Sequence, residues 1–388
     1  MLGLEGTYTA IYATKAHNAK YPDPDENTTI LNKNVSEWLL GTVKIPNDSK
    51  NTPRPDTYSV YAKFLRCLAA PNYTVFSNTT SQNQWIRESV RDPKTSHHVV
   101  ALENPHNEIH LAVGGFYQKG LFNADPIPGA NGDMGDNETA AFDPIFFFHH
   151  CFIDYTFSRW QLLWGRTKRG DLTLIPGYPG TFLGKGDGQP RDFPPGTTLY
   201  MTTPLDPFPY NSNDVTDINE LGYTYGPGSL DDVFVVVPGR SGKIPFDINH
   251  PQVPDPMKLA GSNPDGDNLF PVTKRVHNIT RNQYDGSFVV RLCARGHDGE
   301  DVEVGRESIL SRWNVKRCSN CQSHPNVDVY IPLDAATLEL LEARASPTGQ
   351  KPEISWVVKI QTHDGVQEYP IGPPGEERGS EWPKVDDL

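Results

Sequence analysis

The chain has 388 residues, of which 36% are hydrophobic and 10% aromatic, so it is long enough for two ordinary domains with their own cores. Its formal net charge of −13 argues against a nucleic-acid partner, because no basic stripe is present to replace phosphate counterions. No apolar run of about 18 residues and no secretory leader is visible, so we expect neither a membrane span nor export. The 5 cysteines do not suggest a disulfide framework, and together these features predict a cytoplasmic protein.

The N-terminal part has the pattern of short helices joined by loops. Residues 1–55 are rich in Pro, Asn and Asp and predict loop with one short helix near residues 36–40. Asp56 is expected to cap a helix whose apolar residues recur at helical spacing until Pro71. Ser81 is expected to cap the helix that follows.

Two further helices carry most of the histidines in this part of the chain. Asn104 before a proline predicts the start of a helix that contains His106 and His110. A polar, Gly- and Asp-rich loop over residues 116–139 comes next. Asp143 and the proline after it predict the start of a long apolar helix through Trp164.

The periodicity changes from helical to alternating in the second half of the chain. Residues 170–228 carry Pro and Gly every few positions and predict an extended wrapping segment. Strands are then predicted at residues 232–237, 287–292, 327–331 and 354–360, with one helix near residues 334–344. We therefore expect an α+β protein with a helical metal-binding domain over residues 1–228 and an all-β sandwich or barrel over residues 229–388.

The histidine pair is the first indication of chemistry. Residues four apart on a helix lie on one face, so His106 and His110 could bind one metal ion. A single pair is weak evidence, because surface helices carry such pairs by chance. A third histidine from another helix would leave one coordination position open, as in catalytic metal sites.

A second, longer motif supplies that histidine. The pattern Asp-Pro-x-Phe-aromatic-x-x-His-x3-Asp is met in full by Asp143, Pro144, Phe146, Phe147, His150 and Asp154. It resembles the second copper-binding half of tyrosinases, catechol oxidases and molluscan-type haemocyanins. Residues 273–290, the Cys318–Cys321 pair and the strand near Ile354 resemble the β-rich domain that follows the copper domain in this family.

The resemblance implies a role for each residue of the motif. His106, His110 and His150 are the implied metal ligands, with His149 beside them as a core or supporting residue. Asn107 matches a small polar residue that orients water or substrate. Asp154 matches an aspartate that anchors the helix, while Glu108 should point away from the site and be structural.

The sequence also departs from the family. A type-3 copper oxidase needs three more histidines for a second copper, one of them in a Trp-His-Arg-like helix. Only His17, His97 and His98 precede His106, and none lies in such a motif. These residues predict that the first copper site is absent and that the remaining site holds zinc, a redox-inert Lewis acid.

Within the family, a single zinc site resembles the fungal cyclopenase branch, which acts in quinolone alkaloid biosynthesis. Enzymes of that branch convert the epoxide cyclopenin to viridicatin by ring contraction with loss of methyl isocyanate, without an oxidant. The resulting hypothesis is a zinc-dependent lyase that acts on a small aromatic alkaloid. Its general acid or base would come from Asp133, Asp136 or Glu138 in the loop, or from His149 and Asn107 nearer the metal.

Two alternatives stay open. A type-3 copper oxidase remains if an N-terminal part is missing or if the upstream histidines bind a second metal. A non-catalytic haemocyanin-like binding protein remains if no metal binds. The family's four-helix bundle would be closed either by the helices near Asp56 and Ser81 or by a second subunit in a homodimer.

Overall fold

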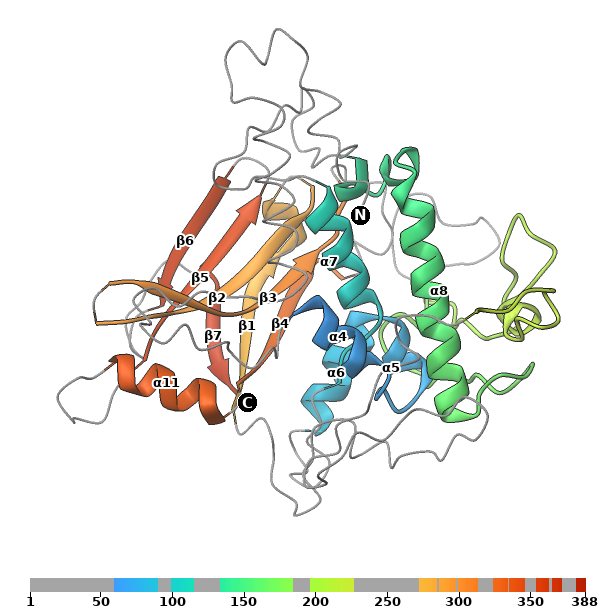
Figure 1. Cartoon of the computed structure of the whole chain (residues 1–388), viewed down its shortest axis with the longest axis horizontal. Helices are drawn as coiled ribbons and strands as arrows, with labels where there is room; N and C mark the ends of the chain where they lie inside the picture. Colours follow the sequence, from blue (N-terminus) through green and yellow to red (C-terminus); the bar gives the residue numbers. More distant parts are fainter. Residues whose placement is uncertain are drawn as a thin grey trace, which may run out of the picture.

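The fold was examined in a computed structural model of the chain (Figure 1). It describes residues 59–89, 99–114, 133–183, 196–226, 272–312 except 285 and 298, 324–345 except 334, 354–371 except 363–364, and 382–388. Most of the helices lie on one side of the molecule and two β-sheets on the other, with one helix beside the sheets (Figure 1). The α+β class is therefore confirmed, whereas the boundary at residue 228 lies outside the described residues and stays a prediction.

The helical part consists of five α-helices in the described residues: α4 (Val60–Cys67), α5 (Tyr73–Ser77), α6 (Thr79–Ser89), α7 (Glu103–Val113) and α8 (Ile145–Trp164). None of these helices, nor any other in the described residues, is long and apolar enough to cross a membrane.

Two of the expected helix starts were wrong. Ser59, not Asp56, caps α4, because its side chain accepts a hydrogen bond from the backbone of Ala62 at 3.0 Å. The helix expected to be capped by Ser81 begins at Thr79 instead, because the side chain of Asn78, three residues before Ser81, accepts the Ser81 backbone N–H at 2.8 Å. Asp56 itself lies outside the described residues.

The starts of the two histidine helices agree with the sequence more closely. Helix α7 begins at Glu103, one residue before the expected Asn104. Helix α8 runs to Trp164 as expected, but Pro144 rather than Asp143 is its N-cap; Asp143 lies one residue earlier, and its carboxylate accepts the backbone N–H of Ile145 at 3.0 Å. Gly165 ends this helix in the left-handed conformation, with φ 62°, where a side chain would be strained.

Aromatic packing fixes the C-terminal half of α8 in the helical core. Trp160 is 1% exposed, stacks on Phe76 with ring centroids 4.6 Å apart, and donates its indole N–H to the Ala70 carbonyl at 2.9 Å. The wrapping segment is confirmed where the structure describes it. It contains one 3-10 helix, η4 (Ser212–Val215), and Thr216 accepts a hydrogen bond from Gln161 of α8 at 3.0 Å.

The β-rich part forms two antiparallel sheets. One has the order β4 (Asn326–Leu333), β1 (Val272–Thr280), β7 (Lys384–Asp387), and the other the order β3 (Asp301–Ile309), β2 (Phe288–Arg295), β5 (Ser355–Thr362), β6 (Gly365–Ile371). Apolar residues of both sheets share one core, which also takes in Leu341 of α11 (Ala335–Ala345). Three predicted strands and the predicted helix are confirmed, while residues 232–237 lie outside the described residues.

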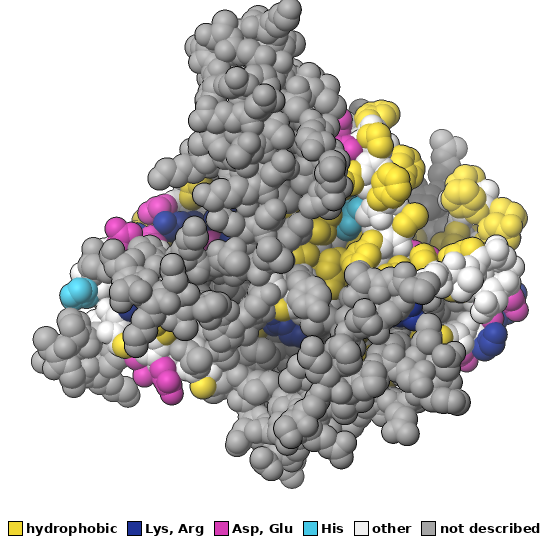
Figure 2. Space-filling model, in the orientation of Figure 1, with side chains coloured by type: hydrophobic (Ala, Val, Ile, Leu, Met, Phe, Trp, Pro, Cys, Tyr) yellow, Lys and Arg dark blue, Asp and Glu magenta, His cyan; other side chains and the backbone are white. Residues whose placement is uncertain are grey.

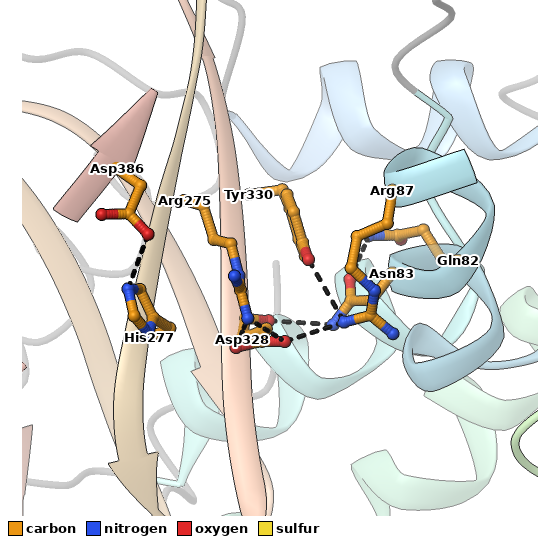
Figure 3. Close-up of polar contacts among 8 residues, drawn as sticks. All are labelled: Gln82, Asn83, Arg87, Arg275, His277, Asp328, Tyr330 and Asp386. Carbon is orange, nitrogen blue, oxygen red and sulfur yellow. Dashed lines mark hydrogen bonds and ion pairs between the residues drawn. The ribbon is translucent and has the colours of Figure 1, made fainter. Parts of the chain in front are cut away.

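Polar contacts dock α6 onto the β4–β1–β7 sheet (Figure 3). Asn83 donates to the Asp328 carbonyl at 2.9 Å, and Arg87 pairs with the Asp328 carboxylate at 2.8 Å. Arg275 of the neighbouring strand reaches the same carboxylate at 3.1 Å. This edge of the interface is partly open to solvent, because 41% of the Arg87 side chain is exposed.

A buried ion pair joins α4, α7 and β3 deeper in the same interface. Lys63 pairs with Glu108, whose side chain is fully buried, and also donates to the Arg306 carbonyl at 2.8 Å. Burial raises the pKa of Glu108, and the ammonium group of Lys63 opposes that shift. The helix that carries the histidine pair is thereby fastened to the β-rich part by a desolvated charge pair.

We expect Lys63→Met to lower the free energy of unfolding by about 3–5 kcal/mol, because it strands the Glu108 carboxylate in a dry interface. Adding Glu108→Gln should recover part of this loss, since it removes the uncompensated charge. Arg87→Met makes the matching change at the solvent-exposed pair and should cost about 1 kcal/mol or less. Urea denaturation of the four proteins measures all of these differences, and equal losses for the two single variants would contradict the assignment.

Candidate metal centre

Helix α7 brings the first two histidines together. His106 and His110 are one turn apart, and their ring centroids are 4.5 Å apart. The sequence prediction that both imidazoles share one face is confirmed. His110 is 2% exposed, so at least one ring of this pair is held away from solvent.

Helix α8 brings two more histidines to the same place. The potential ligand nitrogens of His106, His110, His149 and His150 all lie within 4.8 Å of one another. The His149 ring stacks on His106 with centroids 5.0 Å apart, and the His150 ring lies 5.1 Å from His106. We call these four residues the histidine cluster.

The hydrogen bonds of the cluster leave several ring nitrogens available. His110 Nδ1 lies 2.7 Å from the Met134 carbonyl, to which it can only donate, so Nε2 carries the lone pair. His149 is hydrogen-bonded to the backbone of His106. The Nε2 atoms of His110, His149 and His150 are buried and have no hydrogen-bond partner among the described residues.

Burial keeps these imidazoles neutral. Desolvation, together with the neighbouring histidines, lowers the pKa of His110 to about 3 and that of His149 to about 2. The pKa values of His106 and His150 are lowered as well, chiefly by burial. Neutral imidazoles with buried, unpaired nitrogens are what a metal ion needs as ligands, so the cluster fits a metal such as copper or zinc.

The structure places His149 differently from the sequence interpretation, which kept it outside the ligand set. His149 is 6% exposed, whereas His150 is only half-buried and packs against Phe146 in a tilted arrangement with ring centroids 4.1 Å apart. Sequence reasoning selected His150 because it fills the histidine position of the motif. Both α8 histidines reach the cluster, so the choice of His150 stays a prediction.

The three acid–base candidates predicted from the loop do not join the cluster. Asp133, Asp136 and Glu138 lie in and after η2 (Asp133–Gly135), and none of their carboxylates belongs to the group of converging ligand atoms. The Asp136 carboxylate accepts the Glu138 backbone N–H at 2.6 Å, and Glu138 forms an ion pair with Arg312 at 3.7 Å. Their catalytic role stays a prediction without support from the contacts.

Asn107 does lie at the cluster, but it contacts a histidine. Its side-chain oxygen is 2.9 Å from His106 Nδ1, and the residue is 7% exposed. This hydrogen bond orients the His106 ring and directs its Nε2 away from Asn107. The expected contact with water or substrate is a further prediction that the structure does not test.

Asp154 anchors α8 through two residues that sequence reasoning missed. Its carboxylate accepts a hydrogen bond from the Tyr223 hydroxyl at 2.8 Å and another from the Tyr225 hydroxyl. Burial and this carboxylate raise the pKa values of both tyrosines. The predicted anchoring role is thus borne out by contacts to the wrapping segment, about 70 residues away in sequence, a separation that no local pattern reveals.

Phe146 contacts His110 and His150 of the cluster, and further aromatic side chains on or just before α8 are exposed. Phe142, Phe147 and Phe148 are 78%, 59% and 76% exposed. A histidine side chain is visible among hydrophobic side chains in the region of α7 and α8 (Figure 2). The described surface beside the cluster is therefore apolar and aromatic.

Other residues singled out from the sequence cannot be placed. His17, His97 and His98, the candidates for a second metal, lie outside the described residues, as do Cys318 and Cys321. The predicted loss of the first copper site is consequently not confirmed.

Comparison with known proteins identifies the family. The family model described as the common central domain of tyrosinase matches residues 9–163. The chain is 43% identical over 355 residues to the tyrosinase HcTyr2 of Hahella sp. (strain CCB-MM4), covering 88% of this chain and 58% of that protein. It is 38% identical over 360 residues to a tyrosinase of Aspergillus oryzae, covering 84% of this chain and 60% of that protein.

A solved structure agrees with these relatives. The tyrosinase of Burkholderia thailandensis shares 38% identity with this chain and matches 100% of it and 67% of its own length, with a TM-score of 0.62. The chain spans 58% and 60% of the length of the two curated relatives. The matched proteins are named as tyrosinases, which favours the copper-oxidase alternative and gives no support to the zinc lyase or to cyclopenase. This chain belongs to the tyrosinase family.

Proposed function

We propose that this protein is a copper-dependent oxidoreductase that oxidises phenols or catechols, with the histidine cluster as one of its copper sites. The observation that carries the proposal is the convergence of four neutral imidazoles from α7 and α8 in a chain of the tyrosinase family. Copper would supply the redox chemistry by which dioxygen oxidises the phenol. The protein's own residues would hold the metal, orient its ligands and receive the aromatic ring.

The ligand set is part of the proposal. His106 and His110 from α7 would bind through Nε2, because the Nδ1 atom of each is engaged by Asn107 and Met134 respectively. His150, His149 or both would complete the set from α8. Imidazole nitrogens suit both copper and zinc, so the donor set fits either metal and the family favours copper.

The surroundings of the cluster suit an aromatic substrate. The exposed rings of Phe147 and Phe148 lie on the same helix as His149 and His150 and offer faces and edges to a phenol. The half-buried His150 is more exposed than His149, the other histidine of α8. A small planar molecule would therefore approach the metal from the side of His150. An apolar surround also strengthens electrostatic interactions at the metal.

A tyrosinase-type centre holds two coppers, and the histidine cluster supplies ligands for one. His17, His97 and His98 are the three histidines that precede the cluster in the sequence. Copper stoichiometry tests whether they contribute: two coppers per chain would indicate that they do, and one would indicate a single site.

We expect His110→Ala to abolish high-affinity copper binding and, with it, the oxidation of a catechol under air. His110 is a suitable target because its Nε2 is buried and unpaired and its Nδ1 is fixed. His277→Ala is the control, because this histidine lies on β1 and pairs with Asp386, away from the cluster. Copper content by mass spectrometry and oxygen uptake with catechol are the measurements.

Several results would contradict the proposal. Full copper binding in His110→Ala would refute the site. Oxygen uptake by the zinc-loaded protein, or none by the copper-loaded protein, would refute the copper-oxidase function. Anaerobic, zinc-dependent turnover of cyclopenin would restore the lyase hypothesis instead.

The metal-free protein should lose stability as the pH falls below about 6.5. Unfolded histidines bind protons below that pH, whereas burial lowers the pKa of folded His149 to about 2, so the unfolded state takes up the extra proton. His149→Gln removes one such group. Between about pH 4 and 6 it should therefore reduce the slope of unfolding free energy against pH by about 1.4 kcal/mol per pH unit. Unchanged slopes in urea denaturation of the two metal-free proteins would show that His149 is not buried neutral.

A further inference from the structure

The 3-10 turn η2 lies directly against one of the candidate ligands. The Met134 carbonyl accepts the Nδ1–H of His110 at 2.7 Å, and the Met134 side chain is 1% exposed. This contact selects the tautomer of His110 that presents Nε2 to the cluster. The position of the turn therefore sets the direction in which this ligand points.

The next residue of the turn is held by the β-rich part. The Ser287 hydroxyl lies within donor distance of two carbonyls, that of Gly135 at 2.8 Å, across 152 residues of sequence, and that of Ser311 at 3.1 Å, and the shorter distance favours Gly135 as the acceptor. Its oxygen in turn accepts the backbone N–H of Ser311 at 3.0 Å. Ser287 immediately precedes β2 and Ser311 lies just after β3, so this hydroxyl joins the turn to the ends of two paired strands.

The hydrogen bond between Ser287 and Gly135 is buried and short, so it constrains the position of the η2 turn. Ser287 is 1% exposed, and Gly135 is buried with it. A second contact between this loop and the β-rich part is the ion pair of Glu138 with Arg312 at 3.7 Å, whose side chains are 50% and 39% exposed and which is screened by solvent. A buried hydrogen bond constrains a turn more tightly than such a surface pair does.

We propose that Ser287 is a positioning residue of the metal site: its hydroxyl fixes the η2 turn, and the turn fixes the ring of His110. The β-rich part would then contribute to metal binding without supplying any of the four histidines of the cluster. Supporting residues of this kind orient ligands that themselves touch the metal, and their loss typically costs 10–100-fold in metal affinity. The inference rests on the histidine cluster binding a metal, as proposed above, but not on the reaction catalysed.

The test compares two serine-to-alanine variants of the full chain. Ser287→Ala removes the hydroxyl that holds Gly135. Ser311→Ala removes a hydroxyl that is equally buried, at 0% exposure, and has no hydrogen-bond partner among the described residues. The change in volume and the neighbourhood are the same, so the two variants differ mainly in the contact to η2.

Competition titration measures the copper(II) affinity of each variant, and electron paramagnetic resonance records the spectrum of the bound copper. Both measurements are made well below the unfolding midpoints of the two variants. Ser287→Ala should bind copper about 10–100-fold more weakly and show an altered spectrum, while Ser311→Ala should match the wild type in both. A role in folding alone would lower the unfolding midpoint but leave the spectrum of the folded protein unchanged, and that result would overturn the inference. Equal effects of the two variants would also overturn it.

Ser287→Thr keeps the hydroxyl and is measured alongside the other variants. If Ser287→Ala does not fold, this variant decides the test. It should retain wild-type affinity and spectrum, and a loss of either in a folded Ser287→Thr protein would count against the hydroxyl contact. Absence of copper binding in the wild type would instead refute the proposed metal site itself, so the two failures are distinguishable.

Discussion

The structure is organised around the desolvation of four imidazole rings. An unpaired polar atom buried in a protein costs about 1–3 kcal/mol, and three Nε2 atoms of the histidine cluster are in that situation among the described residues. A bound metal ion would remove this cost, because coordinate bonds to the Nε2 atoms would take the place of the missing hydrogen bonds. The surrounding protein must hold the rings together while the metal is absent.

Three sets of contacts meet that requirement. Hydrogen bonds to the Asn107 side-chain oxygen and the Met134 carbonyl, and one with the His106 backbone, orient individual rings. The Lys63–Glu108 pair fastens α7 to β3, while the tyrosines of the wrapping segment fasten α8 through Asp154. Hydrogen bonds therefore orient the histidine rings. Contacts to the β-rich part and to the wrapping segment hold the two helices that carry these rings. Residues of the β-rich part that lie outside the histidine cluster can therefore still influence the metal site.

Local periodicity made much of this fold predictable from the sequence. Helical spacing located His106 and His110 on one face, and alternation located three of the strands. The contacts that position the ligands were not predictable, because they join distant residues: Lys63 and Glu108 are separated by 45 positions and Gly135 and Ser287 by 152. His149 was set aside because the motif has a place for one histidine, although the helix brings both to the cluster. The choice of zinc depended on upstream histidines that the structure does not describe, and the relatives favour copper.

The central claim is that the histidine cluster holds copper. Crystals of the copper-loaded protein, with anomalous diffraction measured on both sides of the copper and zinc absorption edges, test it most directly. The account predicts a copper peak about 2.0–2.1 Å from the Nε2 atoms of His106, His110 and at least one of His149 and His150, the usual distance for a metal–imidazole bond. A zinc peak at that position, or a copper peak bound elsewhere with the cluster empty, would contradict it.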